Sequence, residues 1–600
     1  MAANSPASSA SSLPEQVLSH AQSGREVVQD FVPLADSLEW DLGQQYLRDR
    51  GNKAFISDAS PVPFVINNDG TLSRNAAEVF FASLVAAEKN GTLEDEIFVL
   101  ELGIGVGLFA RFFLDHFKEL CVKNRKGFYD RLCYVAADRS QRMLLDVLRH
   151  GVLGNHPGRY CVRNVDAMNP DAELPHDVRF RHIKGKPFRA VFLNYLLDCL
   201  PAAVLEIDED RVKQLCVRTC IARNVTLSAH TDMSLKQLQA RAKANDSRSR
   251  QELLEVYGLF ASEYDYRPVE IKKVPLGDFA LEYSRRMSKR VLHSYGAIQS
   301  LEKLLDLVTD DGFILVNDYG PTQTTRDDEF EHQRFSLATF VGVNFPLLKA
   351  YFGDQGKCQF VHPTGSDSRG IHTRLLGRKL DTDTVTRFYA CFSDAAHEQV
   401  LEPIGKARMC LRAGRFELAA DFYQQALKLQ PRNWLLLNEV SSFLTFSMRD
   451  LKAAIDMAKL ALGLNPTCSA ELWNTLGDAL FEFGRTAEAR GAYQKAMAVN
   501  NSDVRSRYNL AWVLAREGDH AAALRHIADA LALDKTGEYR DRLLQKHSEV
   551  VARLAMRHQT EYFLLINLVS KYAKPDDKKP NDAAPPDPQR TPEPPVESWG

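Results

Sequence analysis

The 600-residue sequence predicts two folded parts, an α/β domain built on a mostly parallel sheet and an all-helical repeat array. Between residues 97 and 318, short apolar runs alternate with segments whose apolar side chains recur at helical spacing. That alternation is typical of parallel strands joined by crossover helices. From about Leu401 the pattern is helical throughout, and alanines return at a fixed interval.

The strands of the α/β domain are expected where apolar runs end in polar or glycine-rich segments, at residues 97–102, 133–137, 190–194 and 312–317. Helices are expected between them, at 108–114 and 141–150. A charged, mostly helical stretch interrupts this alternation, and we expect it to form an insertion over about 230–292 that caps the functional edge of the sheet. The domain is predicted to cover 96–395, after a helical lead-in over 31–95.

The C-terminal third repeats with a period of 34 to 35 residues. Its equivalent small residues are Ala419, Ala454, Ala489 and Ala523, and again Ala426, Ala461, Ala496 and Ala530. One unit reads Trp473-x2-Leu476-Gly477, followed by Gly484, Ala489 and Tyr493, which resembles the tetratricopeptide repeat. We expect four such repeats over 400–535, with capping helices over 536–573 that cover the apolar face of the last repeat.

The composition of the two ends and the net charge exclude several classes of protein. Residues 1–30 are rich in Ser and Ala, and residues 574–600 hold eight of the 26 prolines, so both are predicted to be disordered tails. The net charge is −3, which argues against a protein that coats nucleic acid. No apolar run approaches the roughly 18 residues of a membrane span, and the first thirty residues lack the pattern of a signal peptide.

The ten cysteines are scattered, and only Cys216 and Cys220 lie close together. This spacing is typical neither of a zinc site nor of a disulfide framework. We therefore expect reduced thiols, a cytoplasmic protein and no metal centre.

The sharpest chemical signal follows the first predicted strand. Glu101-Leu-Gly103-Ile-Gly105-Val-Gly107 lies between that strand and a helix, where glycine allows a tight turn and lets a ligand approach bare backbone. A dinucleotide site would need Gly-x-Gly-x-x-Gly, and a P-loop would need Gly-Lys-Ser/Thr. The pattern resembles the first motif of class I S-adenosylmethionine-dependent methyltransferases, which implies a Rossmann-like fold. The alternative is a glycine-rich turn that holds no ligand.

Four further positions extend this resemblance. Asp138 ends the second predicted strand, where a carboxylate can accept both ribose hydroxyls, or can simply cap the next helix. The phrase Asp138-x-Ser140-x-x-Met-Leu also looks like this class, which implies that Ser140 belongs to the cofactor site. By the same resemblance, Asp166 is placed against the adenine amino group and Met168 against the ring face. Asp166 could equally be an ordinary turn residue.

Later strand ends narrow the family. Asn194-Tyr195-x-x-Asp198-x-Leu-Pro and Asp318-Tyr319-Gly, separated by a large insertion, look similar to the MidA-like methyltransferases. That family includes the mitochondrial complex I assembly factor that methylates a protein arginine. Asn194, Asp198 and Asp318 are therefore candidates for the methyl-acceptor site, although each could instead be a cap or a loop hydrogen bond. Tyr195 stands where the family commonly has Glu.

These features predict an S-adenosyl-L-methionine-dependent methyltransferase that acts on a protein docked by the repeats, possibly on arginine. Fusion to a docking module raises the local concentration of a bound target. Two other hypotheses remain open. The first is a scaffold that binds the cofactor without catalysis and works through its repeats, and the second is a small-molecule methyltransferase whose repeats mediate oligomerisation.

Overall fold

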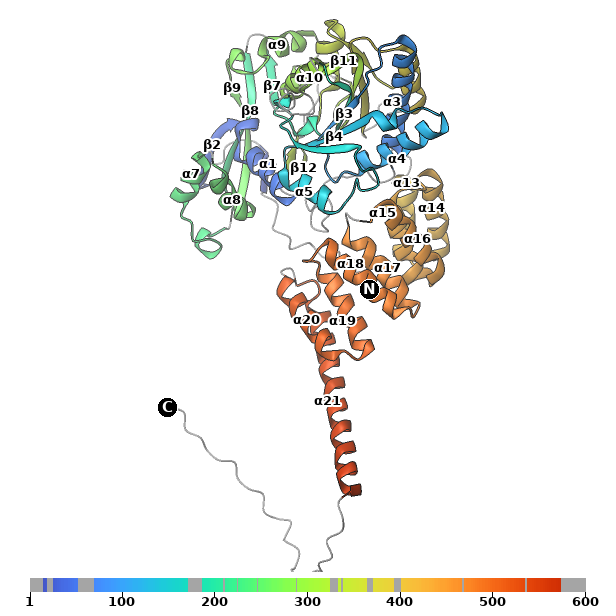
Figure 1. Cartoon of the computed structure of the whole chain (residues 1–600). Helices are drawn as coiled ribbons and strands as arrows, with labels where there is room; N and C mark the ends of the chain where they lie inside the picture. The colour runs from blue at the N-terminus through green and yellow to red at the C-terminus, as the bar shows by residue number, and fades with distance from the viewer. Residues whose placement is uncertain are drawn as a thin grey trace, which may run out of the picture.

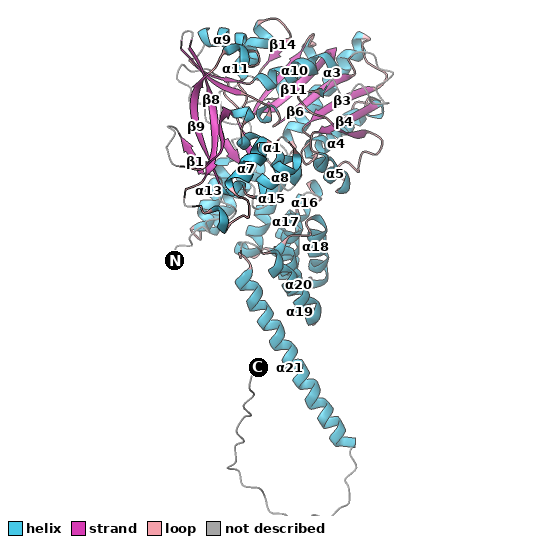
Figure 2. Ribbon diagram, turned by 90° about the vertical axis from the view of Figure 1, so that its left-hand side faces the viewer, coloured by secondary structure: helices cyan, strands magenta, loops and turns pink. Residues whose placement is uncertain are grey.

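The computed structural model describes most of the chain, and Figures 1 and 2 show it from two sides. The described residues are 15–18, 25–51, 70–170, 186–208, 211–223, 225–244, 246–286, 289–323, 333–335, 338–363, 371–392, 401–466, 469–534 and 537–572. The predicted Pro-rich tail over 574–600 lies outside them, as do residues 1–14 of the predicted N-terminal tail.

A seven-stranded sheet forms the centre of the α/β part, in the order β14-β15-β11-β6-β3-β4-β5. Its strands are β3 (Ile97–Leu102), β4 (Leu132–Asp138), β5 (Tyr160–Asn164), β6 (Phe188–Asn194), β11 (Val308–Asp318), β14 (Gln359–Val361) and β15 (His372–Gly377). The five strands from β11 to β5 are parallel, and β15 is antiparallel to both of its neighbours. The sheet is thus mostly parallel, as the sequence predicts.

Helices cover both faces of this sheet because its strands are apolar on both sides. On β6, Ala190 and Phe192 belong to one buried cluster, whereas Val191 and Leu193 belong to another. The first cluster is completed by α3 (Thr71–Asn90), α4 (Leu108–Lys123), α5 (Gln141–Arg149) and α12 (Thr382–Cys391). The second is completed by α10 (Tyr295–Leu307) and α11 (Phe345–Leu348). The helix α3 of the predicted lead-in is therefore part of the domain's own core.

A second sheet, which the sequence did not predict, combines strands of the predicted insertion with strands that precede it in the sequence. It follows the order β1-β9-β8-β7-β10, with β2 also paired to β8. Its strands are β1 (Glu15–Leu18), β2 (Val27–Pro33), β7 (Ala203–Asp208), β8 (Arg211–Ile221), β9 (Phe260–Pro268) and β10 (Arg290–His293). The helices α7 (Leu235–Lys243), α8 (Ser247–Glu255) and α9 (Gly277–Arg286) complete this part of the chain, and β12 (Gln333–Phe335) and β13 (Ala338–Phe340) form a separate pair.

Two predictions need correction here. The segment 230–292 does hold the helices α7, α8 and α9, as predicted, but it also contributes β9 and β10 to the second sheet, which was not predicted. Its polar residues hid β9: Glu263 is buried within the strand and pairs with Arg218 of β8. The predicted tail over 1–30 is also structured in part, because β1 pairs with β9 and β2 pairs with β8. Strand pairing with residues more than 180 positions away leaves no local sequence signal.

The C-terminal part consists of antiparallel helix pairs (Figure 1). The helices are α13 (Leu401–Arg412), α14 (Phe416–Leu429), α15 (Trp434–Phe443), α16 (Leu451–Leu464), α17 (Ala470–Glu482), α18 (Thr486–Val499), α19 (Val504–Glu517) and α20 (His520–Leu533). The first set of repeating alanines is fully buried, as close helix packing requires. Arg449, which replaces the turn glycine of the other repeats, adopts the same left-handed conformation at φ 57°.

A single helix, α21 (Arg540–Tyr572), replaces the capping helices predicted over 536–573. Leu543 and Val550 in its first turns are buried, so this part does cover the last repeat. The rest extends away from the array (Figures 1 and 2), and Met556 and Phe563 are exposed. The helix continues past the repeat because its sequence holds no Gly or Pro that would end it.

One buried arginine joins the two parts of the molecule. Arg111 lies on α4 and donates hydrogen bonds to the backbone carbonyls of Gly463 at 3.1 Å and Leu464 at 2.9 Å. These carbonyls end α16, where backbone oxygens have no partner within the helix. A guanidinium also favours the negative end of the helix dipole. The repeat array is therefore anchored to the helix that directly follows the glycine loop.

Candidate functional site

A pocket lies at the carboxyl ends of β3 and β6, where the order in which the chain adds strands to the sheet reverses. The chain runs outward from β3 through β4 to β5, then returns to place β6 on the other side of β3. Open α/β sheets bind ligands at the carboxyl ends of the strands at this switch point. The pocket is lined there by Glu101, Leu102, Gly103, Ile104, Gly105, Asp138, Arg139, Ser140, Met143, Val165, Asp166, Ala167, Met168, Asn194, Tyr195, Leu196, Cys199, Leu200 and Pro201, and by four residues of α1.

The glycine loop presents bare backbone to this pocket at two of its three glycines. Gly103 and Gly105 line the pocket, at φ 72° and 53°, which favour glycine. A Cβ added to Gly105 would meet nothing within 4 Å, so open space lies directly above its backbone. Gly107 differs, because a Cβ there would come within 3.3 Å of Val147 and Val152. The third glycine therefore allows helix packing and does not line the pocket.

Glu101, the last residue but one of β3, belongs to a hydrogen-bond network that crosses five neighbouring strands. Its carboxylate accepts from the Tyr134 hydroxyl at 2.8 Å and from Asn194 Nδ2 at 3.2 Å. Asn317 Nδ2 donates to Asn194 Oδ1 at 2.8 Å, and the Thr373 hydroxyl donates to Asn317 Oδ1 at 2.7 Å. Burial raises the pKa of Glu101 to about 8, and the two hydrogen bonds offset only part of this effect.

Asp138 faces the same loop from the end of β4. Its carboxylate accepts the backbone N–H of Ser140 at 2.8 Å and, more weakly, that of Gly105 at 3.5 Å. Burial raises the pKa of Asp138 to about 6. The hydroxyl of Ser140 caps α5 through Met143 N and donates to the carbonyl of Arg48 at 2.7 Å. Ser140 is thus already engaged within the protein, whereas Asp138 keeps free acceptor capacity toward the pocket.

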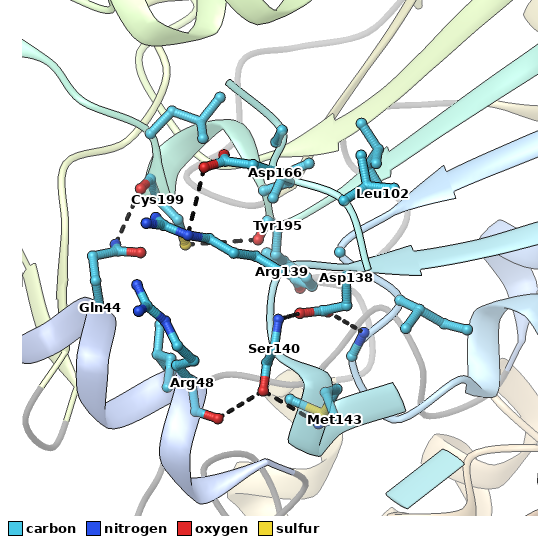
Figure 3. Close-up of a pocket in the computed structure, with 18 of the residues that line it drawn as sticks. Gln44, Arg48, Leu102, Asp138, Arg139, Ser140, Met143, Asp166, Tyr195 and Cys199 are labelled. Carbon is cyan, nitrogen blue, oxygen red and sulfur yellow. Dashed lines mark hydrogen bonds and ion pairs between the residues drawn. The ribbon is translucent and has the colours of Figure 1, made fainter. Parts of the chain in front are cut away.

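Asp166 and Met168 line the pocket beside Asp138, as the sequence predicts from the next strand end. Asp166 accepts the backbone N–H of Met168 at 2.9 Å, and its carboxylate lies 3.6 Å from Arg139 Nε. Figure 3 shows this ion pair crossing the pocket. The sequence left open whether Asp166 is an ordinary turn residue or part of the cofactor site. In the structure Asp166 both accepts a hydrogen bond within the turn and lines the pocket.

Two of the three predicted acceptor-site residues do not line the pocket. Asn194 does, but Asp198 and Asp318 are buried behind it. Asp318 Oδ2 accepts the backbone N–H groups of Leu196 at 3.2 Å and Leu197 at 2.8 Å, and Oδ1 accepts that of Tyr319 at 2.8 Å. Burial and the nearby Asp198 carboxylate raise the pKa of Asp318. Its observed contacts hold the loop after β6 in place.

Tyr195 also lines the pocket, although it was not among the predicted acceptor-site residues. Its backbone has φ 50°, which is strained for a tyrosine, and its N–H donates to the carbonyl of Asn317 at 2.9 Å. Its ring lies 4.9 Å from the ring of Tyr319, and the two hydroxyl oxygens are 3.1 Å apart. Strained backbone next to a pocket is a recurrent feature of functional sites.

The helix α1 (Leu38–Arg50) covers the pocket, a position that no sequence pattern indicates. It contributes Trp40, Gln44, Leu47 and Arg48. Gln44 Nε2 donates to the carbonyl of Cys199 at 3.1 Å, and the Arg48 carbonyl accepts from Ser140 (Figure 3). The helix itself lies within the helical lead-in predicted over 31–95. Its contacts could not be predicted, because they join residues more than 90 positions apart.

The chemistry of the pocket suits a nucleoside linked to an amino acid. A carboxylate at a strand end, Asp138, matches a pair of ribose hydroxyls. The open space over Gly105 leaves room for the aliphatic part of a ligand to contact the backbone. The buried Glu101 carboxylate favours a positive charge nearby. These residues fit S-adenosyl-L-methionine, which carries ribose, an ammonium and a sulfonium. Their individual roles stay predictions.

Comparison with known proteins agrees with this chemistry. A family model described as "Putative S-adenosyl-L-methionine-dependent methyltransferase" matches residues 81–358, and two tetratricopeptide-repeat models match residues 404–433 and 468–536. Among solved structures, the chain is similar to the MamA protein (24% identity, 30% of this chain and 97% of that one, TM-score 0.24). It is also similar to a thermophilic TPR protein of Thermus thermophilus (19% identity, 30% and 93%, TM-score 0.23).

Curated relatives include peroxisomal targeting signal receptors. That of Candida albicans is 30% identical over 185 residues, which cover 30% of this chain and 31% of the receptor. That of Candida glabrata is 35% identical over 97 residues, or 16% of each protein. The chain thus spans less than a third of the length of these relatives. Within the described residues, no helix is both long and apolar enough to cross a membrane.

The family matches confirm the predicted fusion. The chain joins a domain of the S-adenosyl-L-methionine-dependent methyltransferase family, over residues 81–358, to tetratricopeptide repeats, and S-adenosyl-L-methionine is the cofactor of that family.

Proposed function

We propose that this protein is a Rossmann-like methyltransferase that uses S-adenosyl-L-methionine to methylate a protein held by its repeats. The observation that supports the proposal most strongly is the bare backbone at Gly103 and Gly105, which opens into the pocket between Glu101 and Asp138. The strand order and its switch point between β3 and β6 support the Rossmann-like assignment.

In this proposal, Asp138 holds the ribose, Gly103 and Gly105 accommodate the methionine half, and Asp166 and Met168 contact the adenine. The bound cofactor supplies an activated methyl group on a sulfonium. The protein mainly aligns the acceptor and excludes water. The helix α1 helps to exclude water from the pocket, because its Trp40 side chain is buried against the protein core.

The acceptor side of the pocket is assigned to Asn194 and Tyr195, at the end of β6. Asp318 is better explained as a positioning residue, because its carboxylate fixes the backbone of Leu196 and Leu197 beside that side of the pocket. Asp198 is buried next to Asp318 and does not line the pocket either. An arginine side chain is one acceptor that this proposal includes.

The repeats support a protein substrate, because stacked helix pairs present extended binding surfaces for peptides. The anchor from Arg111 to the end of α16 holds the array next to the cofactor domain. A cytoplasmic setting is part of the proposal, because the nine cysteines of the described residues are all free thiols.

The test is transfer of a labelled methyl group by the full chain into desalted cell lysate, followed by separation of proteins from small molecules. The proposal expects label in the protein fraction with the wild type and none with Gly105→Val. Label confined to small molecules would support the small-molecule methyltransferase instead.

A second candidate, a cofactor-binding scaffold without catalysis, is favoured by one observation. Asp198 and Asp318 do not line the pocket, so neither of the two carboxylates predicted for the acceptor site contacts an acceptor there. This candidate expects cofactor binding by calorimetry, no transfer to any fraction, and capture of protein partners that does not depend on Gly105.

A further inference from the structure

One arginine of the pocket has no partner for its charge. Arg48, in the last turn of α1, lines the pocket, and Figure 3 shows its side chain pointing into it. Its Nε atom is buried and has no hydrogen-bond partner. Among the residues that the structure describes, no group accepts a hydrogen bond from its guanidinium or forms an ion pair with it. A charged group that is buried without a partner loses hydrogen bonds to water and gains none in exchange.

Other buried arginines of this chain are supplied with partners by the fold. Arg189 Nη2 lies 2.6 Å from Glu94 Oε1. Arg111 donates to the two backbone carbonyls that end α16. Because these structural arginines are paired within the protein, the unpaired guanidinium of Arg48 is better explained by a partner that arrives with a ligand.

A second arginine adds to the positive charge around Arg48. Arg139 also lines the pocket, and Figure 3 shows the two guanidinium groups pointing toward each other. Burial and the charge of Arg139 lower the pKa of Arg48. Arg139 has an acidic neighbour, but its Nε atom is 3.6 Å from Asp166 Oδ2, which is beyond hydrogen-bond distance. An anion between the two arginines would reduce their repulsion and accept hydrogen bonds from both.

The acidic residues that line the pocket do not neutralise Arg48. Burial raises the pKa of Glu101 to about 8, so this carboxyl group keeps its proton at neutral pH. The Asp138 carboxylate accepts two backbone N–H groups, and Asp166 faces Arg139. None of these three residues forms an ion pair with Arg48. The pocket therefore keeps a positive charge that a ligand can offset.

The backbone of Arg48 is held in place over the pocket. Its carbonyl accepts the hydroxyl of Ser140 at 2.7 Å. One turn earlier in α1, Gln44 Nε2 donates to the carbonyl of Cys199 at 3.1 Å. These contacts fix α1 across the pocket, from the loop after β4 to the loop after β6. Because the helix is already positioned, Arg48 loses less conformational entropy when it binds a ligand.

The ligand group that fits Arg48 best is a carboxylate. The planar guanidinium matches the two oxygens of a carboxylate with two parallel hydrogen bonds. One negative charge offsets one unpaired guanidinium, whereas a phosphate would bring a second negative charge close to Asp138 and Asp166. Under the proposed function, a carboxylate can enter this pocket from two sources. One is the amino-acid end of S-adenosyl-L-methionine, and the other is the methyl acceptor.

We propose that Arg48, assisted by Arg139, binds a carboxylate of the ligand that occupies the pocket. The bound carboxylate then ties α1 to the ligand, so the same helix covers the pocket and reads the charge of its contents. The two sources of the carboxylate rest on the proposed function. The site itself does not depend on methyl transfer.

Calorimetry with two forms of the cofactor tests the first source. S-adenosyl-L-methionine and its decarboxylated form differ only in the carboxylate. If the cofactor supplies this group, Arg48→Met should weaken binding of the intact cofactor by about tenfold or more and leave binding of the decarboxylated form unchanged. Arg48→Lys keeps the charge and should lose less affinity than Arg48→Met. The control is Arg149→Met, at an exposed position of α5 outside the pocket, which should bind both forms like the wild type.

Transfer of a labelled methyl group into lysate tests the second source. If the acceptor supplies the carboxylate, Arg48→Met should bind both cofactor forms like the wild type but transfer less label, by about tenfold or more. Amidation of the carboxyl groups in the lysate should then lower transfer by the wild type to the same extent. The inference is overturned by an equal loss of affinity for both cofactor forms, by unchanged affinity with unchanged transfer, or by a loss of transfer that amidation does not reproduce.

A measurement on the wild type separates this inference from the proposed function and needs no substitution. Phenylglyoxal modifies accessible arginines, and mass spectrometry reports the rate at each of them. Malonate, a small dicarboxylate, should slow the modification of Arg48 by about threefold or more relative to chloride at equal ionic strength, and should not protect Arg149. If the wild type binds neither cofactor form but malonate protects Arg48, the proposed function fails and the carboxylate site stands. If neither malonate nor S-adenosyl-L-methionine protects Arg48, the carboxylate site is wrong.

Discussion

The carboxylate of Asp318, at the end of β11, accepts the backbone N–H of Leu197 at 2.8 Å, across the gap to the loop that follows β6. The same oxygen accepts the N–H of Leu196, whose side chain lies beside Gly103 in the pocket. One buried carboxylate thus connects the ends of two neighbouring strands to the glycine loop. The shape of the pocket therefore depends on a residue that does not line it.

Replacing Asp318 should damage both the fold and the pocket. In Asp318→Ala, the buried N–H groups of Leu196 and Leu197 lose their acceptor, which should lower the free energy of unfolding by about 2–4 kcal/mol. Cofactor affinity should fall as well, since Leu196 is no longer held beside Gly103. Urea unfolding and calorimetry measure the two effects. Asp310→Asn, an exposed carboxylate at the other end of β11, should change neither, and equal effects from both variants would argue against the positioning role.

Glu101 should make stability depend on pH in a defined window. Its pKa is about 8 in the folded protein, above the ordinary value of 4.5, so the folded state holds an extra proton between these values. Stability from this group is complete below pH 4.5 and is lost as the pH rises toward 8. Glu101→Gln should be about 1 kcal/mol less stable than the wild type at pH 5, since one hydrogen bond is lost, and more stable at pH 9. A difference that is constant with pH contradicts the raised pKa.

Arg111 should control how the repeats attach to the cofactor domain. Arg111→Met keeps the apolar stem of the side chain but removes the donors to Gly463 and Leu464, which should cost about 1–3 kcal/mol. We expect unfolding to separate into two transitions and the radius of gyration in solution scattering to increase. Lys123→Met, at an exposed position of the same helix, is the control. A single transition and an unchanged radius for Arg111→Met would mean that other contacts hold the array.

Asp138 should contribute to affinity through the ribose. Asp138→Asn removes the charge from these hydrogen bonds and should weaken cofactor binding by about 10- to 100-fold, the value of one or two charge-assisted bonds. Calorimetry should show the same loss with 5′-methylthioadenosine, which keeps the ribose but lacks the amino acid. A loss restricted to S-adenosyl-L-methionine would instead assign Asp138 to the methionine half.

The sequence predicted the elements whose side chains are buried on both faces. Each of β3, β4, β6 and β11 contains at least four consecutive apolar residues, so each indicated a strand directly. The second sheet escaped prediction because β9 buries Glu263 against Arg218, and charge inside a strand resembles an exposed helix. The repeats were recognisable because each unit places small residues at the same buried positions between its two helices.

For the site, the sequence predicted strand-end positions but not side-chain directions. Asn194 and Asp318 lie at neighbouring strand ends, as expected, yet only Asn194 lines the pocket, since Asp318 is turned toward the backbone of Leu197. The position of α1 over the pocket could not be predicted from the sequence either. Gln44 contacts Cys199 across 155 positions of the sequence, and no local pattern encodes such a contact.

In the proposed function, the backbone around Gly105 forms part of an S-adenosyl-L-methionine site. A side chain at Gly105 would enter the space that the cofactor needs, whereas Gly151, which also has positive φ and open space around it, lies outside the pocket. Gly105→Val and Gly151→Val should therefore share a similar cost in backbone strain, so they form a matched pair.

Titration calorimetry of S-adenosyl-L-methionine into the wild type and these two variants tests the claim most directly. We predict saturable 1:1 binding by the wild type and by Gly151→Val, and no detectable binding by a folded Gly105→Val. Absence of binding by the wild type, or equal binding by all three proteins, would contradict the account.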